Sequence, residues 1–152
     1  MKRIFPTFPI LLVGLALTGC ATSQSFDVSI KNQTSRPIIV GFVKDGPPFE
    51  EAWASPEDYA QLPPSRQPAT WGVVVPDGKI VTTHIQGKFE RGSAPFLRVY
   101  LDEHSADQLL AISRGIGGRV DVGLHPGGDN RFVLMLDEHG KLVAKLARLS
   151  SR

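Results

Sequence analysis

After residue 25 the chain is divided into short runs of β-forming residues, and the first of these alternates hydrophobic and polar positions. Phe26, Val28 and Ile30 alternate with polar neighbours, which is the period of a β-strand with one buried face. Further β-rich runs follow at residues 37–43, 71–75, 79–86, 96–101, 108–113, 119–124, 131–136 and 141–146. Short segments rich in Gly, Pro and Asp separate several of them. The pattern predicts an all-β fold, an antiparallel β-sandwich or barrel of about nine short strands.

One long interruption, the insertion (residues 44–70), separates the second run from the third. It is much longer than the usual connection of about 2 to 6 residues. Within it, Ser55 followed by Pro56, Glu57 and Asp58 is typical of the start of a helix, because it places an N-cap, a Pro and two acids in the first turn. We therefore expect a short helix inside the insertion and a single domain over residues 26–150.

Residues 1–19 have the pattern of a secretory signal. Lys2 and Arg3 form a positive start, and residues 10–17 are an uninterrupted apolar run. That run is shorter than the roughly 20 apolar residues that a helix needs to span a bilayer. The pattern predicts a removable signal peptide.

The end of this segment, Leu17, Thr18, Gly19 and Cys20, resembles the lipobox of bacterial lipoproteins. In that family the Cys thiol receives a diacylglycerol, and a signal peptidase cuts just before it. The resemblance therefore implies a lipid on Cys20, a tether over residues 20–25, and an envelope protein whose partner is the membrane. Ala21 stands where enteric-type bacteria use Asp to retain lipoproteins at the inner membrane, so the resemblance favours the outer membrane. The alternative is an ordinary secreted protein with a free thiol at Cys20.

The charge balance excludes one class of partner. The chain has 17 Lys and Arg against 15 Asp and Glu, and removal of residues 1–19 takes away Lys2 and Arg3, which leaves 15 of each. A neutral domain offers no excess of positive charge for phosphates, so we expect no nucleic-acid partner. Cys20 is the only cysteine, and the fold must be stable without disulfides.

An aromatic and acidic cluster in the insertion is the main candidate for partner binding, and it consists of Phe49, Glu50, Glu51, Trp53 and Tyr59. If Pro48 starts a helical turn, Phe49 and Trp53 share one face. The cluster either plugs an open end of the sandwich or binds an envelope protein or a glycan. We expect Trp53 to be at least half buried, with Phe49, Glu50 and Glu51 at the rim. The surrounding segment also resembles one in small uncharacterised bacterial lipoproteins, which implies no activity.

Residues that could bind a metal ion lack a recognisable spacing. His104 and His139 each follow Asp-Glu, and two such turns at one end of a sandwich could hold an ion. The chain lacks a His-Glu-x-x-His motif, a second Cys and an Asp-rich calcium loop. We therefore expect no metal site and no cofactor.

Catalytic motifs are equally absent from the sequence, which has no Gly-x-Ser-x-Gly elbow and no Gly-x-Gly-x-x-Gly fingerprint. Arg114, Arg119 and Arg131 could offer a basic edge to an anionic glycan or lipid headgroup, although solvated loop charges are the simpler interpretation. The sequence predicts a non-enzymatic binding or structural module. A periplasmic ligand- or metal-handling module and a small envelope hydrolase are the alternatives.

Overall fold

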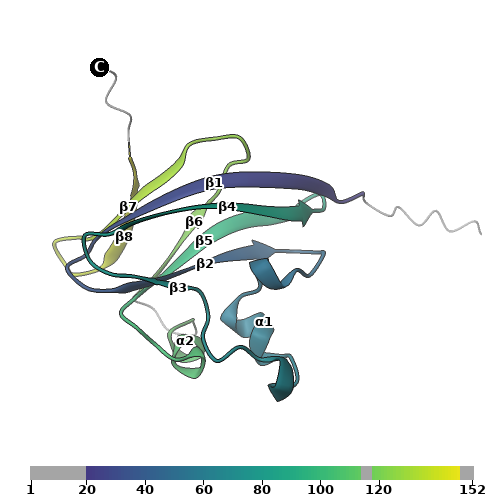
Figure 1. Cartoon of the computed structure of the whole chain (residues 1–152), viewed down its shortest axis with the longest axis horizontal. Helices are drawn as coiled ribbons and strands as arrows, with labels where there is room; N and C mark the ends of the chain where they lie inside the picture. Colours follow the sequence, from purple (N-terminus) through teal and green to yellow (C-terminus); the bar gives the residue numbers. More distant parts are fainter. Residues whose placement is uncertain (1–19, 114–117, 148–152) are drawn as a thin grey trace, which may run out of the picture.

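Two packed β-sheets make up the fold in the computed structural model, which describes residues 20–113 and 118–147 (Figure 1). Sheet A contains β1 (Thr22–Gln33), β4 (Ile80–Phe89), β7 (Asn130–Leu136) and β8 (Leu142–Leu146), in the order β4-β1-β7-β8. Sheet B contains β2 (Ile38–Asp45), β3 (Val73–Val75), β5 (Ala94–Leu101) and β6 (Arg119–Gly123), in the order β3-β2-β5-β6. The β-sandwich predicted from the alternating pattern is confirmed.

Every strand pair is antiparallel among the described residues except one. Strands β1 and β7 run parallel, with Val28 opposite Asn130 and Gln33 opposite Met135. Alternation of hydrophobic and polar residues is the same in parallel and antiparallel strands, so the pattern carried no information about this direction. Strand β1 therefore lies between β4 and β7, and β7 begins about a hundred residues after β1.

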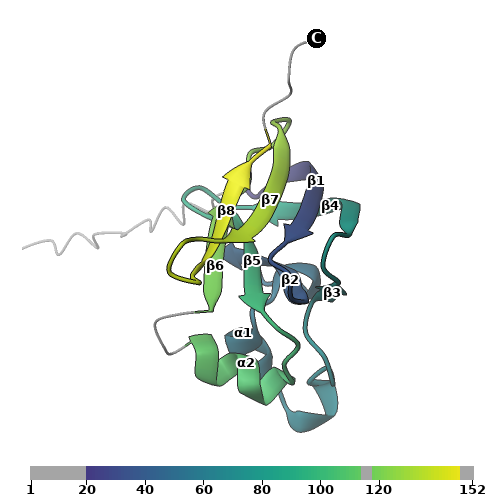
Figure 2. The ribbon, with the colours of Figure 1, turned by 90° about the vertical axis from the view of Figure 1, so that its left-hand side faces the viewer.

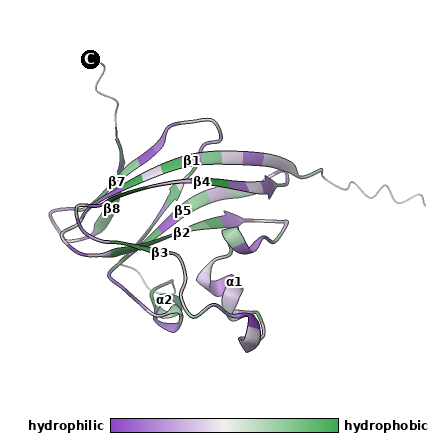
Figure 3. Ribbon diagram, viewed as in Figure 1, coloured by the Kyte–Doolittle hydropathy of each residue, from purple (hydrophilic) through white to green (hydrophobic). Residues whose placement is uncertain are grey.

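The core lies between the two sheets. Phe26, Val28 and Ile30 of β1 are buried, and they meet buried residues of β5 such as Leu97 and Val99. Figure 3 shows hydrophobic residues along strands such as β2, whereas polar residues gather in the turns and around α1.

The predicted strand over residues 108–113 is wrong, because this segment belongs to helix α2 (Ala106–Ser113). The Ser105 N–H donates to Gln108 Oε1 at 2.9 Å, and the Gln108 N–H donates to Ser105 Oγ at 3.4 Å. These reciprocal bonds are a capping box, which starts a helix. Leu109 of this helix is buried against Ile39 and Tyr100 on the outer face of sheet B, so part of this outer face is covered as well.

The insertion contains three short helical turns, η1 (Glu51–Trp53), α1 (Pro56–Ala60) and η2 (Pro64–Arg66). The predicted helix is confirmed as α1, with a capping box between Ser55 and Asp58. Strand β2 continues to Asp45 and β3 begins at Val73, so the connection starts and ends slightly later than predicted. Figure 2 shows α1 and α2 together below the strands.

The N-terminal boundary also differs from the prediction. Strand β1 begins at Thr22, where the alternating pattern placed its start at Phe26. Only Cys20 and Ala21 then remain of the tether expected over residues 20–25. None of the helices within residues 20–113 and 118–147 is long and apolar enough to cross a membrane.

Candidate functional site

A groove opens between the sheets on the side where β3 and β4 form the edges, and we call it the edge groove. Its volume is about 370 Å³, within the range of about 300 to 1,000 Å³ typical of ligand pockets. Ile30, Val40 and Phe42 line its bottom, β4 residues 81–83 form one wall, and Val73 forms the other. The side chain of Val73 is 57% exposed, so an apolar wall faces solvent.

The insertion closes one end of the edge groove through Trp71, which follows it directly, and Tyr59. The Trp71 Nε1–H donates to the carbonyl oxygen of Ala54 at 2.8 Å, and the ring packs edge-on against Tyr100. A Cβ atom on Gly41 would lie 2.5 Å from the Trp71 ring, so this position of β2 requires glycine. The Tyr59 hydroxyl donates to the carbonyl oxygen of Glu51. These contacts fix that end of the groove before any ligand binds.

The outer edge of β4 is partly covered by the insertion. The backbone N–H and C=O groups of the odd-numbered residues of β4 point toward β1. The hydrogen bond from the Asn32 N–H to the carbonyl of Lys79, the residue just before β4, establishes this alternation. The even-numbered residues face outward. Three of their outward groups are bonded to the insertion or to Lys44 at its start: the Gln86 carbonyl accepts from Trp53, the Lys88 N–H donates to Glu50, and the Lys88 carbonyl accepts from Lys44.

The same edge is open along the edge groove. Within residues 20–113 and 118–147, no hydrogen bond reaches the outward N–H and C=O groups of Thr82 and His84. Thr82 lines the groove itself. The unpaired part of the β4 edge therefore coincides with the apolar hollow.

Trp53 plugs the sandwich beside the groove. Its side chain is 1% exposed, and its ring packs edge-on against Phe26, Phe42 and Phe89 at centroid distances of 5.5, 5.8 and 5.1 Å. The Nε1–H donates to the Gln86 carbonyl at 2.8 Å. The expectation that Trp53 is at least half buried is confirmed, and Trp53 is not available to a partner at the surface.

An ion pair between the buried Lys44 and the partly exposed Glu50 joins the insertion to β4. The Lys44 side chain is 2% exposed, and its Nζ donates to Glu50 Oε2 at 2.6 Å and to the Lys88 carbonyl at 2.9 Å. Burial alone would raise the pKa of the Glu50 carboxyl, but the hydrogen bonds from Lys44 and from the Lys88 N–H outweigh it, so the pKa lies below its ordinary value. Glu50 is thus a structural partner of Lys44.

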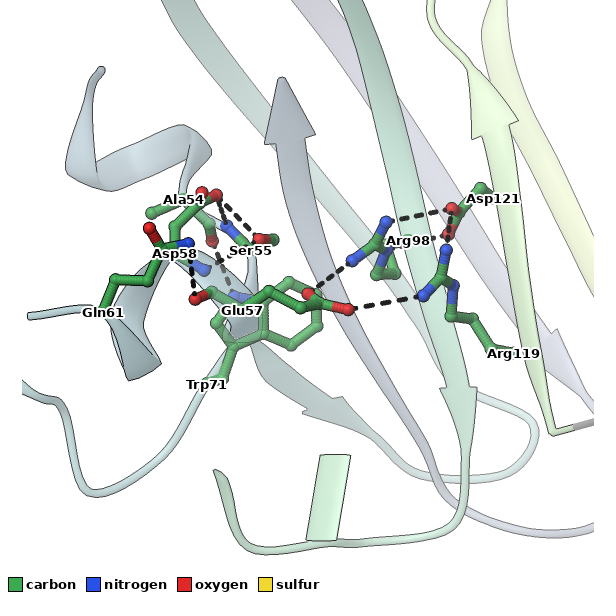
Figure 4. A network of polar contacts seen from close by, with 9 residues as sticks. All are labelled: Ala54, Ser55, Glu57, Asp58, Gln61, Trp71, Arg98, Arg119 and Asp121. Carbon is green, nitrogen blue, oxygen red and sulfur yellow. Dashed lines mark hydrogen bonds and ion pairs between the residues drawn. The ribbon is translucent and has the colours of Figure 1, made fainter. Parts of the chain in front are cut away.

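A second polar network fastens α1 to the outer face of sheet B (Figure 4). The Arg98 side chain on β5 is 11% exposed and donates to Glu57 of α1 and to Asp121 of β6, both at 3.0 Å. Arg119 forms ion pairs with the same two carboxylates, at 3.6 Å to Glu57 and 2.8 Å to Asp121. Burial alone would lower the pKa of Arg98, but the bond and charge of Asp121, with Glu57, raise it above its ordinary value. The guanidinium therefore stays charged.

The sequence suggested that Arg114, Arg119 and Arg131 could form a basic edge, and the structure describes two of these side chains. Arg119 is paired with Glu57 and Asp121, and Arg131 is paired with Asp129 at 2.6 Å. Arg114 lies outside the described residues. Each of the two described arginines therefore has an acid beside it.

The aromatic and acidic cluster predicted in the insertion is divided by the structure. Glu50 has an extended backbone, so the helical turn begins at Glu51 and not at Pro48, and Phe49 does not share a helical face with Trp53. Phe49, near the start of the insertion, is 55% exposed, as expected for a rim residue. Glu51 is exposed, lines the edge groove with Tyr59 and bonds to Arg66 at 3.3 Å.

The two histidines considered as metal ligands have separate environments. His104 Nε2 lies 2.9 Å from the Leu101 carbonyl, and the exposed His139 lies beside Glu138. In the part of the chain that the structure describes, no three His, Cys, Asp or Glu side chains are grouped so as to hold a metal ion. Leu17, Thr18 and Gly19 of the lipobox lie outside the described residues, and Cys20 is exposed.

We compared the chain with models of protein families, with curated proteins and with solved structures, and none of the three comparisons found a match. Function is therefore inferred from the lipobox resemblance and from the edge groove. Sequence reasoning missed the groove residues Val73 and Thr82 and the buried Lys44. One signal was present in the sequence. The three valines from Val73 to Val75 stand between a glycine and a proline, which indicates a strand too short to cover the strand beside it, β2.

Proposed function

We propose that the protein is a lipid-anchored lipoprotein of the bacterial cell envelope, and that its folded domain is a non-enzymatic module that binds a ligand in the edge groove. The order of Leu17, Thr18, Gly19 and Cys20 supports the anchor, and Ala21 supports the outer membrane. The observation that carries the binding function is that the edge groove has an apolar bottom and is open to solvent. The volume of the groove is about 370 Å³.

The position of the groove relative to Cys20 suits an anchored binding module. Cys20 precedes the first residue of β1 by only two positions. Ile30, at the bottom of the groove, is eight residues after Thr22, the first residue of the same strand. A strand rises by about 3.3 Å per residue, so about 26 Å separate the groove from the start of the strand. We infer that this separation keeps the groove clear of the lipid and accessible to ligands in solution.

Lipid attachment is tested by the change Cys20→Ser in the full chain, with Ser23→Ala as the matched control. The hydroxyl cannot replace the thiol that receives the diacylglycerol, so the Cys20→Ser chain should lose the palmitate label and leave the membrane fraction. The control should keep both. A Cys20→Ser chain that still carries the label and sediments with membranes would show that the lipobox interpretation is wrong.

Ligand binding is tested by placing a photo-crosslinking amino acid at Val73, which lines the edge groove, or at Val74, which does not. Both side chains are exposed on the same short strand. Irradiation of intact cells should give adducts from position 73 and few from position 74. Equal adducts from the two positions, or none from 73, would contradict a binding site in the groove.

A further inference from the structure

We propose that the edge groove binds an extended polypeptide segment, which adds to sheet A as a strand along the free edge of β4. This inference rests on the proposed function and names the chemistry of its ligand. It depends on the outward backbone groups of β4 and on the shape and charge of the groove beside them.

The backbone of β4 offers the hydrogen bonds that a further strand needs. Thr82 and His84 each direct one N–H and one C=O away from β1, and these groups have no partner within the described residues. A strand at a sheet edge presents such groups as a template for pairing with another extended chain. Two residues at alternate positions supply up to four backbone hydrogen bonds.

The insertion limits the free edge to the part beside the groove. Gln86 and Lys88, the next outward residues of β4, are already bonded to Trp53, Glu50 and Lys44. An added strand would therefore end at the insertion, which defines its position along β4. Proteins usually protect their edge strands, and here one half of the edge is covered while the other half is left open.

The groove also accommodates alternate side chains of an added strand. Side chains of a strand point alternately to the two faces of its sheet. Val81 and Thr83 of β4 line the groove, whereas His84 points to the outer face and pairs with Asp27 of β1. A segment beside β4 would direct every second side chain into the apolar hollow between Val81 and Val73. Small or medium apolar side chains fit this volume.

The charge of the lining restricts the ligand further. Among the residues that the structure describes, Glu51, at the insertion end, is the one charged side chain that lines the edge groove. Its partner Arg66 is 60% exposed, so this pair gives way to a competing cation at little cost. The complementary ligand is a β-forming segment whose single charged side chain is a basic residue at the end that meets the insertion. A second copy of the chain, paired through its own β4 edge, is the competing occupant.

Selection from a displayed library of random nine-residue peptides provides the test, with the full-length lipoprotein in lipid nanodiscs as the target. Enriched peptides should carry apolar residues at alternate positions. The change Val73→Asp places a charge in the groove wall and should weaken binding of the best peptide at least about tenfold, whereas Val74→Asp should leave it within about twofold. Both positions are exposed, so both variants should fold.

Backbone pairing is tested with the best peptide methylated on alternate backbone nitrogens. One set of N-methyl groups should abolish binding, and the other set should leave it intact, because only alternate residues donate to β4. In hydrogen exchange, the amides of Thr82 and His84 should exchange fast in the free protein and become protected with the peptide. The amide of Thr83 faces β1 and should be protected in both states.

Three results would overturn the proposal: no enriched peptide, equal effects of the two methylated sets, or a dimer whose formation protects Thr82 in the absence of peptide. Failure of the lipid anchor is separable from all of these. Peptide binding in the groove does not require the lipid. The full chain with Cys20→Ser should therefore select the same peptides as the wild type, whether or not Cys20 is lipidated. Conversely, an anchored chain that selects nothing would refute strand addition alone.

Discussion

Replacement of Trp53 and Phe49 by alanine separates the structural part of the insertion from its exposed rim. Trp53 is buried against three phenylalanine rings, whereas Phe49 is more than half exposed. Removal of a buried Trp or Phe side chain costs about 3 to 5 kcal/mol in free energy of unfolding. A change at an exposed position usually stays within about 0.5 kcal/mol.

The contacts of Trp53 place its loss near the upper end of that range. Edge-to-face ring pairs contribute about 0.5 to 1.5 kcal/mol beyond simple burial, and the bond to the Gln86 carbonyl contributes about 1 kcal/mol. A loss of about 4 kcal/mol is a large share of the total stability of about 5 to 15 kcal/mol. Trp53→Phe keeps most of the packing but removes the hydrogen bond, and its cost should be intermediate.

Urea denaturation followed by circular dichroism measures these differences. With a slope of about 2 kcal/mol per M, a loss of about 4 kcal/mol lowers the midpoint by about 2 M, and Phe49→Ala should move it by less than about 0.25 M. Equal and severe destabilisation by Phe49→Ala and Trp53→Ala would refute the division of the insertion into plug and rim.

Two further predictions concern the contacts of β4. Because the pKa of Glu50 is lowered in the folded state, its contribution to stability is present above about pH 4.5 and is lost as the pH falls through the lowered value. The variant Glu50→Gln should therefore be less stable than the wild type by the largest amount at neutral pH, where Lys44 loses its opposite charge. In melts at different pH values, this difference in stability should shrink below about pH 4.5. A difference that does not change with pH would contradict the ion pair. Gly87→Ala would place a Cβ atom 2.4 Å from Trp53 Nε1, and should cost about 1 to 3 kcal/mol in thermal or urea melts. If Gly87→Ala melts like the wild type, the close packing of Trp53 on β4 is not present in solution.

Strand β1 was predictable because its buried residues alternate with more exposed ones. Phe26, Val28 and Ile30 are all buried, as their spacing indicated. The helix α1 was predictable for the same kind of local reason, since Ser55 and Pro56 specify its first turn. In each case the signal lay within a few residues of sequence.

Helix α2 was missed although its local signal was present. Ser105 and Gln108 have the spacing of a capping box, but the apolar run around Leu109 resembles a buried strand when it is considered alone. Short apolar runs do not distinguish a strand from a helix that packs on a sheet. The contact of Leu109 with the outer face of sheet B is what decided between them.

The edge groove could not be predicted, because it depends on which strands become edges. Val73 and Thr82 lie on different sheets, and only the pairing of β3 with β2 and of β4 with β1 brings them to one side of the sandwich. The buried position of Lys44 was also hidden, because lysine is almost always solvent-exposed unless it is paired. Its partners, Glu50 and the Lys88 carbonyl, come from separate parts of the chain.

The central position of β1 has a consequence for the order in which the protein can fold. The strand lies at the start of the domain, yet its parallel partner β7 begins only at Asn130. Contacts between residues so far apart form slowly, because the long loop must close before they are made. If the chain is exported from its N-terminus, sheet A cannot be completed until nearly the whole chain has crossed. The amides of β1 and β7 should then gain protection together in pulse-labelled hydrogen exchange during refolding.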